Sequence, residues 1–440
     1  MPRARKLFGT DGVRGRAGVD LTEAVARDLG AAAARFAGPG ETILIGRDTR
    51  ESGPALELAL VGGIVSAGGV ATRAGVIPTP GVAVLAREAG AALGCVISAS
   101  HNPYEDNGIK FLGGDGRKLA DADEARIESL MASPAGGAGG RAERVDDAWM
   151  RYVEWLAETY GEDVEAGLRI GIDCANGAAW QAGPALFERL GEAVERIGCH
   201  PDGRNINAGV GSTHLDAVAA LVSEHGLDAG IAFDGDADRC LAVDGRGRAV
   251  NGDVIIAVLG IDLHRRGMLT GDRVVVTSMT NLGFHRLMRE HGIAVEVTDV
   301  GDRYVLERML ETGAVLGGEQ SGHVVDLRHH TTGDGLATAL MLLGALHRLG
   351  LRPEQANDML KPFPQRLVAV TADRSLLPSA DRIWQEVEAV SEKLGDGGRI
   401  VLRASGTEPL VRVMVEAEDE AECERISERL VSLVQTEIGA

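Results

Sequence analysis

Short runs of Val, Ile, Leu and Ala alternate with longer amphipathic stretches along most of the chain, which is typical of strands covered by helices on both faces. The runs that we predict to be strands are residues 42–46, 92–97, 169–173, 229–233, 273–277, 294–298 and 314–317. Several of them lead directly into clusters of Gly, Asp or Ser. Ligands of open α/β sheets bind beyond the carboxyl ends of strands, so we expect the functional site in these clusters.

Breaks in composition divide the chain into four units. Residues 133–140 are rich in Gly, residues 244–252 form a polar turn, and the Lys-Pro-Phe-Pro at 361–364 cannot continue a helix. Beyond this last break the pattern predicts a strand at 366–371, a helix at 379–394, two strands around Ser405 and a final helix from about Asp419. We therefore predict α/β domains at 1–149, 150–250 and 251–361, followed by a smaller α+β domain at 362–440.

Charge and cysteine usage exclude several classes of protein. The 440 residues include 45 Lys and Arg against 65 Asp and Glu, and the net charge of −20 argues against a general nucleic-acid or membrane-surface binder. The five cysteines are far apart and form no Cys-x-x-Cys, which predicts no disulfide framework or zinc knuckle and favours a reducing cytoplasm. The basic residues at the N-terminus are not followed by an apolar signal-peptide core, and no stretch of about 18 uncharged apolar residues occurs, so secretion and membrane insertion are not expected.

The first cluster, Ser-Ala-Ser-His-Asn-Pro at 98–103, follows a predicted buried strand. Ser100 at such a strand tip can be a nucleophile or a phosphate carrier, with His101 beside it and Lys110 supplying a nearby cation. The same residues are also common turn formers, so an ordinary hydrogen-bonded turn is the alternative.

The second cluster, Asp-Gly-Asp-Ala-Asp-Arg at 234–239, places three carboxylates at alternate positions of one loop. An EF-hand calcium loop is excluded, because it needs Gly where Arg239 stands and Glu where Gly245 stands. Three carboxylates next to an apolar strand repel one another without a counter-ion. They therefore favour Mg²⁺ bridging to a phosphoryl group over a solvated acidic turn.

Two further clusters have the residue types of a sugar-binding loop and an anion-binding loop. Residues 317–323 bring together Glu319, Ser321 and His323, a set suited to sugar hydroxyls or an amine but also found in polar turns. Arg403 and Arg412 flank a Ser-Gly-Thr segment that is typical of a phosphate-binding loop, with a solvated hairpin as the alternative. No Lys is followed by Ser or Thr, and none of the candidate serines has the glycines of a nucleophile elbow, so neither a Walker-A kinase nor an α/β-hydrolase is indicated.

Together these clusters resemble the α-D-phosphohexomutase superfamily, which has a phosphoserine loop, a metal loop, a sugar loop and a phosphate loop in this order. Residues 8–15, 300–304 and 318–323 resemble the phosphoglucosamine mutase family within it. Gln320 stands where phosphomannomutases and phosphoglucomutases more often have Met. Ala237 and Val210 depart from the residues that many members have, Gly and Cys respectively, but neither departure removes a ligand.

The resemblance implies three similar α/β domains with mixed sheets around a central cleft, plus the smaller C-terminal domain. It also implies the interconversion of glucosamine 6-phosphate and glucosamine 1-phosphate, for UDP-N-acetylglucosamine and cell-wall synthesis. Ser100 would carry the phosphoryl group, and a sugar bisphosphate would be both intermediate and activator. One Mg²⁺ per subunit would bind Asp234, Asp236, Asp238 and the phosphorylated Ser100.

The resemblance also assigns the remaining roles. Substrate would be bound by Glu319, Ser321, Arg403, Ser405, Gly406, Thr407 and Arg412. The general acid and base would be found among Arg14, His101, Lys110 and His323. The expected assembly is a cytoplasmic homodimer without nucleic-acid or membrane partners. The alternatives are a phosphomannomutase or phosphoglucomutase with the same mechanism, a Mg²⁺-dependent phosphatase, and a sugar-phosphate-binding regulator without turnover.

Overall fold

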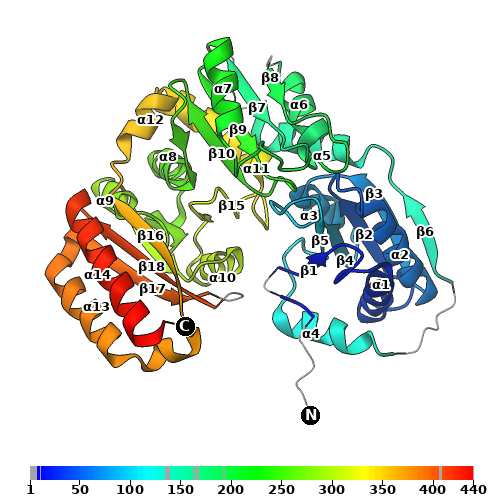
Figure 1. Ribbon diagram of the computed structural model, residues 1–440. Coiled ribbons are helices and arrows are strands. Elements are labelled where there is room, and N and C mark those ends of the chain that lie inside the picture. The colour runs from blue at the N-terminus through cyan, green and yellow to red at the C-terminus, as the bar shows by residue number, and fades with distance from the viewer. Residues whose placement is uncertain are drawn as a thin grey trace.

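The computed structural model describes residues 7–9, 11–133, 139–161, 164, 168–191, 194–405 and 409–439. Four sheets with their helices follow one another around a central opening, so that the first and the last units face each other across it (Figure 1). Among the described residues, no helix combines the length and the apolar character needed to cross a membrane.

The first unit is built on a mixed sheet of order β1-β5-β4-β2-β3-β6. Its elements are β1 (Val13–Arg16), α1 (Glu23–Ala37), β2 (Thr42–Arg47), α2 (Gly53–Ser66), β3 (Val70–Val76), α3 (Thr79–Glu88), β4 (Leu93–Ile97), β5 (Asp106–Gly113), α4 (Asp121–Leu130) and β6 (Arg141–Arg144). The strands β2, β3, β4 and β6 are parallel, whereas β5 runs antiparallel to β4 and to β1. The carboxyl end of β4 therefore lies beside β5, and the chain between them forms the serine loop.

The second unit has a mixed sheet of order β11-β10-β9-β7-β8. Its elements are α5 (Ala148–Tyr160), β7 (Ile170–Asp173), α6 (Ala179–Arg189), β8 (Val194–Ile197), α7 (Asp216–His225), β9 (Ala229–Phe233), β10 (Cys240–Asp244) and β11 (Ala249–Val250). All five residues of β9 are buried, which explains why an uninterrupted apolar run encodes it. The acidic loop begins directly after this strand.

The third unit has a mixed sheet of order β13-β12-β14-β15. Its elements are α8 (Gly252–Arg265), the 3₁₀ helix η2 (Thr270–Asp272), β12 (Arg273–Thr277), α9 (Leu282–Glu290), β13 (Ala294–Thr298), α10 (Asp302–Thr312), β14 (Leu316–Gly318), β15 (Val324–Asp326), α11 (Gly335–Leu349) and α12 (Pro353–Met359). The sugar loop joins β14 to its antiparallel neighbour β15.

The C-terminal unit is an antiparallel sheet of order β16-β18-β17 with two long helices. Its elements are β16 (Gln365–Thr371), the 3₁₀ helix η3 (Arg374–Ser379), α13 (Asp381–Leu394), the 3₁₀ helix η4 (Gly395–Gly397), β17 (Gly398–Ala404), β18 (Leu410–Ala417) and α14 (Glu420–Ile438). It has an apolar core of its own, from Val370 to Ile438. This is the α+β unit that the sequence predicts.

The predicted strands are close to the observed ones, but the predicted domain boundaries stay a prediction. The largest apolar core runs continuously through the first three units, from Leu44 to Leu360. Helix α3 of the first unit, for example, packs against α5, which precedes the second sheet. The three α/β units are therefore joined by shared packing as well as by the chain.

Candidate active site

Ser100 lies in a tight loop that begins where β4 ends. Its backbone has a positive φ of 52°, a conformation that a non-glycine residue adopts only when its surroundings impose it. Its N–H donates to the Ser98 hydroxyl at 2.9 Å, and that hydroxyl donates to the Asp48 carboxylate at 2.6 Å. These bonds hold the backbone of the loop at Ser100.

Arg50, which the sequence prediction missed, binds the backbone of this loop. It is fully buried and pairs with Asp48 at 2.9 Å. Its remaining guanidinium nitrogens donate to backbone carbonyls of the loop, namely those of Ser100 at 2.9 Å, Asn102 at 2.8 Å, Asp106 at 2.9 Å, and Pro103. A planar guanidinium with several donors can satisfy many carbonyls at once, which a lysine could not do.

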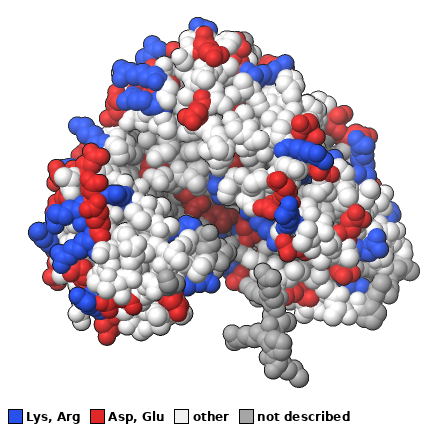
Figure 2. All heavy atoms as spheres, viewed as in Figure 1, with Lys and Arg blue, Asp and Glu red and all other residues white. Residues whose placement is uncertain are grey.

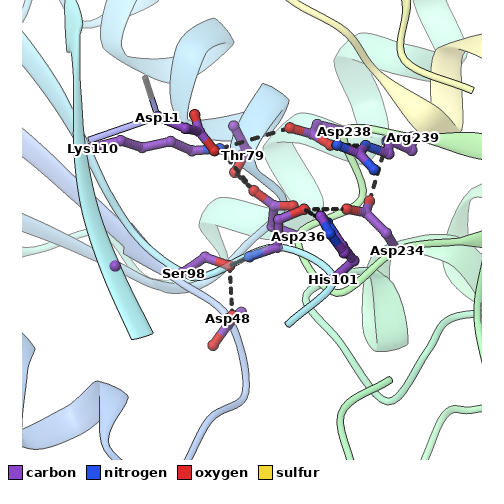
Figure 3. A network of polar contacts seen from close by, with 12 residues as sticks. Asp11, Asp48, Thr79, Ser98, His101, Lys110, Asp234, Asp236, Asp238 and Arg239 are labelled. Atoms are coloured by element: carbon purple, nitrogen blue, oxygen red, sulfur yellow. Dashed lines mark hydrogen bonds and ion pairs between the residues drawn. The ribbon is translucent and has the colours of Figure 1, made fainter. Parts of the chain in front are cut away.

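The three aspartates follow β9 and face the serine loop (Figure 3). Their ligand oxygens all lie within 4.8 Å of one another, and Asp234 and Asp236 are buried. The Ser100 hydroxyl donates to Asp234 at 2.6 Å. The two loops can meet because Gly235 has no side chain: a Cβ there would lie 2.4 Å from the Ser100 carbonyl oxygen.

The charges around the triad are strongly coupled. Lys110 Nζ lies 2.8 Å from Asp236 and 3.7 Å from Asp238. Burial acts to lower the pKa of Lys110, but Asp236, Asp11 and Asp238 outweigh it and raise that pKa. Burial and repulsion from the other two aspartates raise the pKa of Asp234. Such crowding of like charges is stable only when cations compensate it.

The triad fits a hard divalent cation. Asp236 Oδ1 and Asp238 Oδ1 are buried and have no hydrogen-bond partner, which is costly for a charged oxygen. Carboxylate oxygens are the ligands that Mg²⁺ prefers in proteins. The donor set, its convergence and its unsatisfied oxygens therefore fit a divalent cation such as Mg²⁺.

A cleft of about 400 Å³ opens above Ser100 and the triad. Residues of the first three units line it, namely Gly9, Asp11, Arg14, Ser100, Asp121, Asp238, Arg239, Val300, Gly301, Asp302, Arg303, Tyr304, Glu319 and His323. In the space-filling view the central hollow shows acidic groups with basic groups beside them (Figure 2). The structure thus places five of the predicted site residues, Ser100, Arg14, Asp238, Glu319 and His323, around one cleft.

The sugar loop presents Glu319 to this cleft, and the 300–304 motif binds its carboxylate. The Gly301 N–H donates to Glu319 Oε1 at 3.1 Å, so the 300–304 motif supports the carboxylate. His323 lies 3.8 Å from Asp238, and although burial acts to lower its pKa, Asp238 raises that pKa to about 9. The Gln320 amide donates to Asp253 at 3.2 Å, and neither Gln320 nor Ser321 is among the residues that line the cleft.

Of the two other candidates for proton transfer, His101 lies beside Ser100 and Arg14 lines the cleft. His101 Nδ1 is 3.4 Å from the Ser100 hydroxyl, and burial together with Arg239 and Arg14 lowers the pKa of this imidazole. Arg14 pairs with Asp11, a cleft residue that the sequence prediction missed. Asn207, within a segment that the sequence singled out only for its Val210, donates to the Ser100 carbonyl at 2.9 Å.

The predicted phosphate loop lies on the C-terminal sheet. Arg403 and Arg412 are directly opposite each other on β17 and β18, and burial together with Arg412 lowers the pKa of Arg403. Ser405 is buried, and its carbonyl accepts from Arg374. Gly406 and Thr407 lie outside the described residues. None of the described residues of this unit lines the cleft. Two like charges across a strand pair favour an anion between them.

Comparison with known proteins agrees with this geometry. Family models of phosphoglucomutase/phosphomannomutase match the chain along nearly its whole length: alpha/beta/alpha domain I at residues 5–135, domain II at 150–247, domain III at 251–363 and the C-terminal domain at 366–433. The chain belongs to the phosphoglucomutase/phosphomannomutase family.

Within this family the chain is similar to enzymes named phosphoglucosamine mutase. The one from Pelotomaculum thermopropionicum is 48% identical over 98% of this chain and 99% of that protein. The one from Saccharopolyspora erythraea is likewise 48% identical, over 98% of this chain and 99% of that protein.

Solved structures share the fold. A phosphoglucomutase/phosphomannomutase family protein from Burkholderia thailandensis superposes with a TM-score of 0.84 at 25% identity, covering 98% of this chain and 97% of that one. N-acetylphosphoglucosamine mutase from Aspergillus fumigatus, solved in complex with GlcNAc-6P and magnesium, gives 0.68 at 18% identity and covers 99% and 96%.

Proposed function

We propose that this chain interconverts glucosamine 6-phosphate and glucosamine 1-phosphate. The observation that carries the proposal is the Ser100 hydroxyl, which lies 2.6 Å from Asp234 of the carboxylate triad in a cleft that Glu319 also lines. A serine in this position can carry a phosphoryl group between two positions of one sugar. The relatives named phosphoglucosamine mutase support the choice of sugar.

The reaction conserves phosphate. Phosphorylated Ser100 transfers its phosphoryl group to the free hydroxyl of the sugar phosphate, breaking the Ser100 O–P bond and forming a sugar bisphosphate. The bisphosphate turns over in the cleft and returns its other phosphoryl group to Ser100. The same bisphosphate can phosphorylate an unmodified Ser100, so we infer that it also activates the enzyme.

The residues of the site divide the remaining tasks. Asp234, Asp236 and Asp238, with a phosphoserine oxygen, would hold one Mg²⁺, and when bound this ion neutralises charge on the transferring group. Proton transfer falls to Arg14, His101, Lys110 or His323. Of these, His101 lies next to the Ser100 hydroxyl, while Lys110 and His323 contact the triad. Ser405, Gly406 and Thr407 would bind the distal phosphate together with the two arginines, and Ser321 a sugar hydroxyl.

Sugar selectivity tests the proposal directly. A protonated 2-amine gains a charge-assisted hydrogen bond with Glu319 that a 2-hydroxyl cannot match. We expect kcat/KM to be higher for glucosamine phosphate than for glucose phosphate, and lowest for mannose phosphate, whose 2-hydroxyl points the other way. Parallel kinetics on the three sugars, repeated with Glu319→Gln, measure this.

The two arms of this experiment have different consequences. If the wild type prefers glucose or mannose phosphate, the enzyme is a phosphoglucomutase or phosphomannomutase, the activity in the name of the family models. If Glu319→Gln loses activity equally on all three sugars, the carboxylate binds hydroxyls that these sugars share. Stoichiometric release of inorganic phosphate would identify a phosphatase instead.

Arg412 should act on binding of the distal phosphate. A bidentate arginine–phosphate pair contributes about 1.5 to 3 kcal/mol, so Arg412→Ala should lower kcat/KM by about 10- to 200-fold. Phosphoserine hydrolysis by water should change much less, because water carries no phosphate for Arg412 to bind. Arg366→Ala, which removes an exposed ion pair with Glu424 on the same domain, is the control. Equal losses in both reactions would place Arg412 at the transferring group or in the fold.

Assembly and location complete the proposal. We infer a cytoplasmic homodimer that takes a small sugar phosphate and neither a nucleic acid nor a membrane. The five cysteines are all unpaired and buried, which suits a reducing compartment. Sedimentation of the purified protein at micromolar concentration measures the oligomeric state.

A further inference from the structure

Gln320 lies in the sugar loop, yet its side chain bonds away from the cleft. Its amide donates to Asp253 Oδ2 at 3.2 Å, while the adjacent Glu319 lines the cleft. Asp253 is fully buried in the first turn of α8. The same Asp253 oxygen accepts from the Asn281 N–H at 2.9 Å. Asp253 therefore connects the sugar loop with the N-terminus of α9.

Asn281 continues the connection into the C-terminal unit. It is the N-cap of α9, and its side chain bonds both the N–H and the carbonyl of Phe363, at 2.8 and 3.0 Å, in the segment that leads into β16. The approach is close, since a Cβ on Gly283 would lie 2.2 Å from the Lys361 carbonyl oxygen. Asn281 also donates to Glu416 on β18 at 3.1 Å.

Glu416 is the main anchor of this contact. It is fully buried and accepts from Arg399 at 2.7 Å, Gln365 at 2.9 Å and the Leu282 N–H at 3.2 Å, besides Asn281. Arg399 in turn donates to the Thr280 carbonyl. A carboxylate at a helix N-terminus is favourable, and removing it would leave buried donors unsatisfied.

The strand that carries Glu416 also carries Arg412 of the phosphate loop. Two residues on the same strand an even number apart point to the same face, and these two lie about 13 Å apart at about 3.3 Å per residue. Strand β18 is paired on both sides, and Arg403 lies opposite Arg412. Glu416 holds β18 against the N-terminus of α9. Its contacts therefore determine where Arg403 and Arg412 lie relative to the third unit.

We propose that Gln320 is a positioning residue: through the relay of Gln320, Asp253, Asn281 and Glu416 it couples the sugar loop to the orientation of the phosphate-binding domain. The inference rests on the proposed function, because it assigns the two loops to the two ends of one sugar phosphate. It predicts that Gln320 affects all sugar phosphates alike and does not discriminate between them.

Gln320→Met tests this prediction, because methionine has nearly the length of glutamine but no N–H to donate to Asp253. We expect kcat/KM to fall about 2- to 30-fold for glucosamine phosphate and for glucose phosphate by the same factor. Phosphoserine hydrolysis by water should stay at the wild-type rate, since it uses no distal phosphate. A change in the ratio of the two sugars would show that Gln320 contacts the sugar itself and would overturn the proposal.

A double-mutant cycle tests the relay. Gln320→Met removes the bond to Asp253, and Glu416→Gln removes the charge and one of the two acceptor oxygens that hold Asn281, Leu282, Gln365 and Arg399. The loss in the double variant should therefore fall short of the product of the single losses by at least about threefold. Glu418→Gln is the matched control: Glu418 pairs with Arg286 at 3.6 Å between the same two units, but both side chains are largely exposed. In the double variant of Glu418→Gln and Gln320→Met, the two single losses of kcat/KM should multiply. Independent, multiplicative losses for Glu416→Gln would exclude coupling.

A replacement variant and a measurement without turnover test the relay if Glu416→Gln is unstable or the sugar is wrong. If Glu416→Gln does not reach the wild-type Tm, Asn281→Ser replaces it, since serine retains the helix cap but not the amide donor to Glu416. Hydrogen exchange needs no turnover: in Gln320→Met the amides of residues 280–284 should exchange faster. Unchanged exchange would overturn the relay, whatever the sugar substrate is. Faster exchange in a protein that does not turn over glucosamine phosphate would support the relay and reject only the proposed function.

Discussion

Ser100→Ala is expected to abolish mutase activity while the fold stays intact. Removing a covalent nucleophile costs about four to six orders of magnitude in rate, because no other group takes its place. The Ser100 side chain donates one hydrogen bond to Asp234, whereas the loop is held by backbone contacts to Arg50, Asn207 and Ser98 that alanine retains. Intact mass should show one phosphate on the active wild type and none on the variant.

Ser98→Ala is the matched comparison. It keeps the Ser100 hydroxyl but removes the acceptor of the Ser100 N–H and the donor to the buried Asp48. Leaving such a group unsatisfied costs about 1 to 3 kcal/mol of stability, so we expect a lower Tm, a smaller loss of rate than in Ser100→Ala, and a retained phosphate. Full activity of Ser100→Ala, or a phosphate mapped to another serine, would refute the assignment.

Buried apolar runs were the reliable signal for the fold. Strands β9, β12 and β13 have the predicted bounds because each is a short run of apolar or β-branched residues that ends at polar or turn-forming residues. Strand β5 was not predicted, because its Asp106–Gly113 sequence begins with Asp-Asn-Gly and its pairing with β1 and β4 holds it in place. Such antiparallel strands depend on partners that no local pattern reveals.

The site was predictable where chemistry is local in sequence and not where it is assembled from distant segments. Ser100 and the aspartates stand in compact clusters after apolar strands, and the structure brings them together. Arg50 could not be found in the same way, because its role comes from four carbonyls of a loop about fifty residues later. Gln320 stood in the predicted loop, but only the structure shows that its amide bonds to Asp253.

Removal of divalent metal should have the second large effect. Asp234, Asp236 and Asp238 place their oxygens within 4.8 Å of one another, and two of these oxygens are buried without a hydrogen-bond partner. Without a cation, burial and the mutual repulsion of the triad raise the pKa of Asp234. Treatment with EDTA should therefore abolish turnover, and added Mg²⁺ should restore it. Isothermal titration should show one Mg²⁺ per chain.

Replacing single carboxylates distinguishes the loss of a metal ligand from a change in net charge. Asp238→Asn removes one of three charges from a site whose affinity depends on carboxylate count, so we expect weaker Mg²⁺ binding and a fall in kcat of about 100-fold or more. Asp216→Asn, which removes the same charge from the exposed first turn of α7, should leave both unchanged. Activity of EDTA-treated wild type without added metal would refute the Mg²⁺ assignment. Equal effects of Asp238→Asn and Asp216→Asn on Mg²⁺ binding and kcat would show that net charge, not a specific site, is responsible.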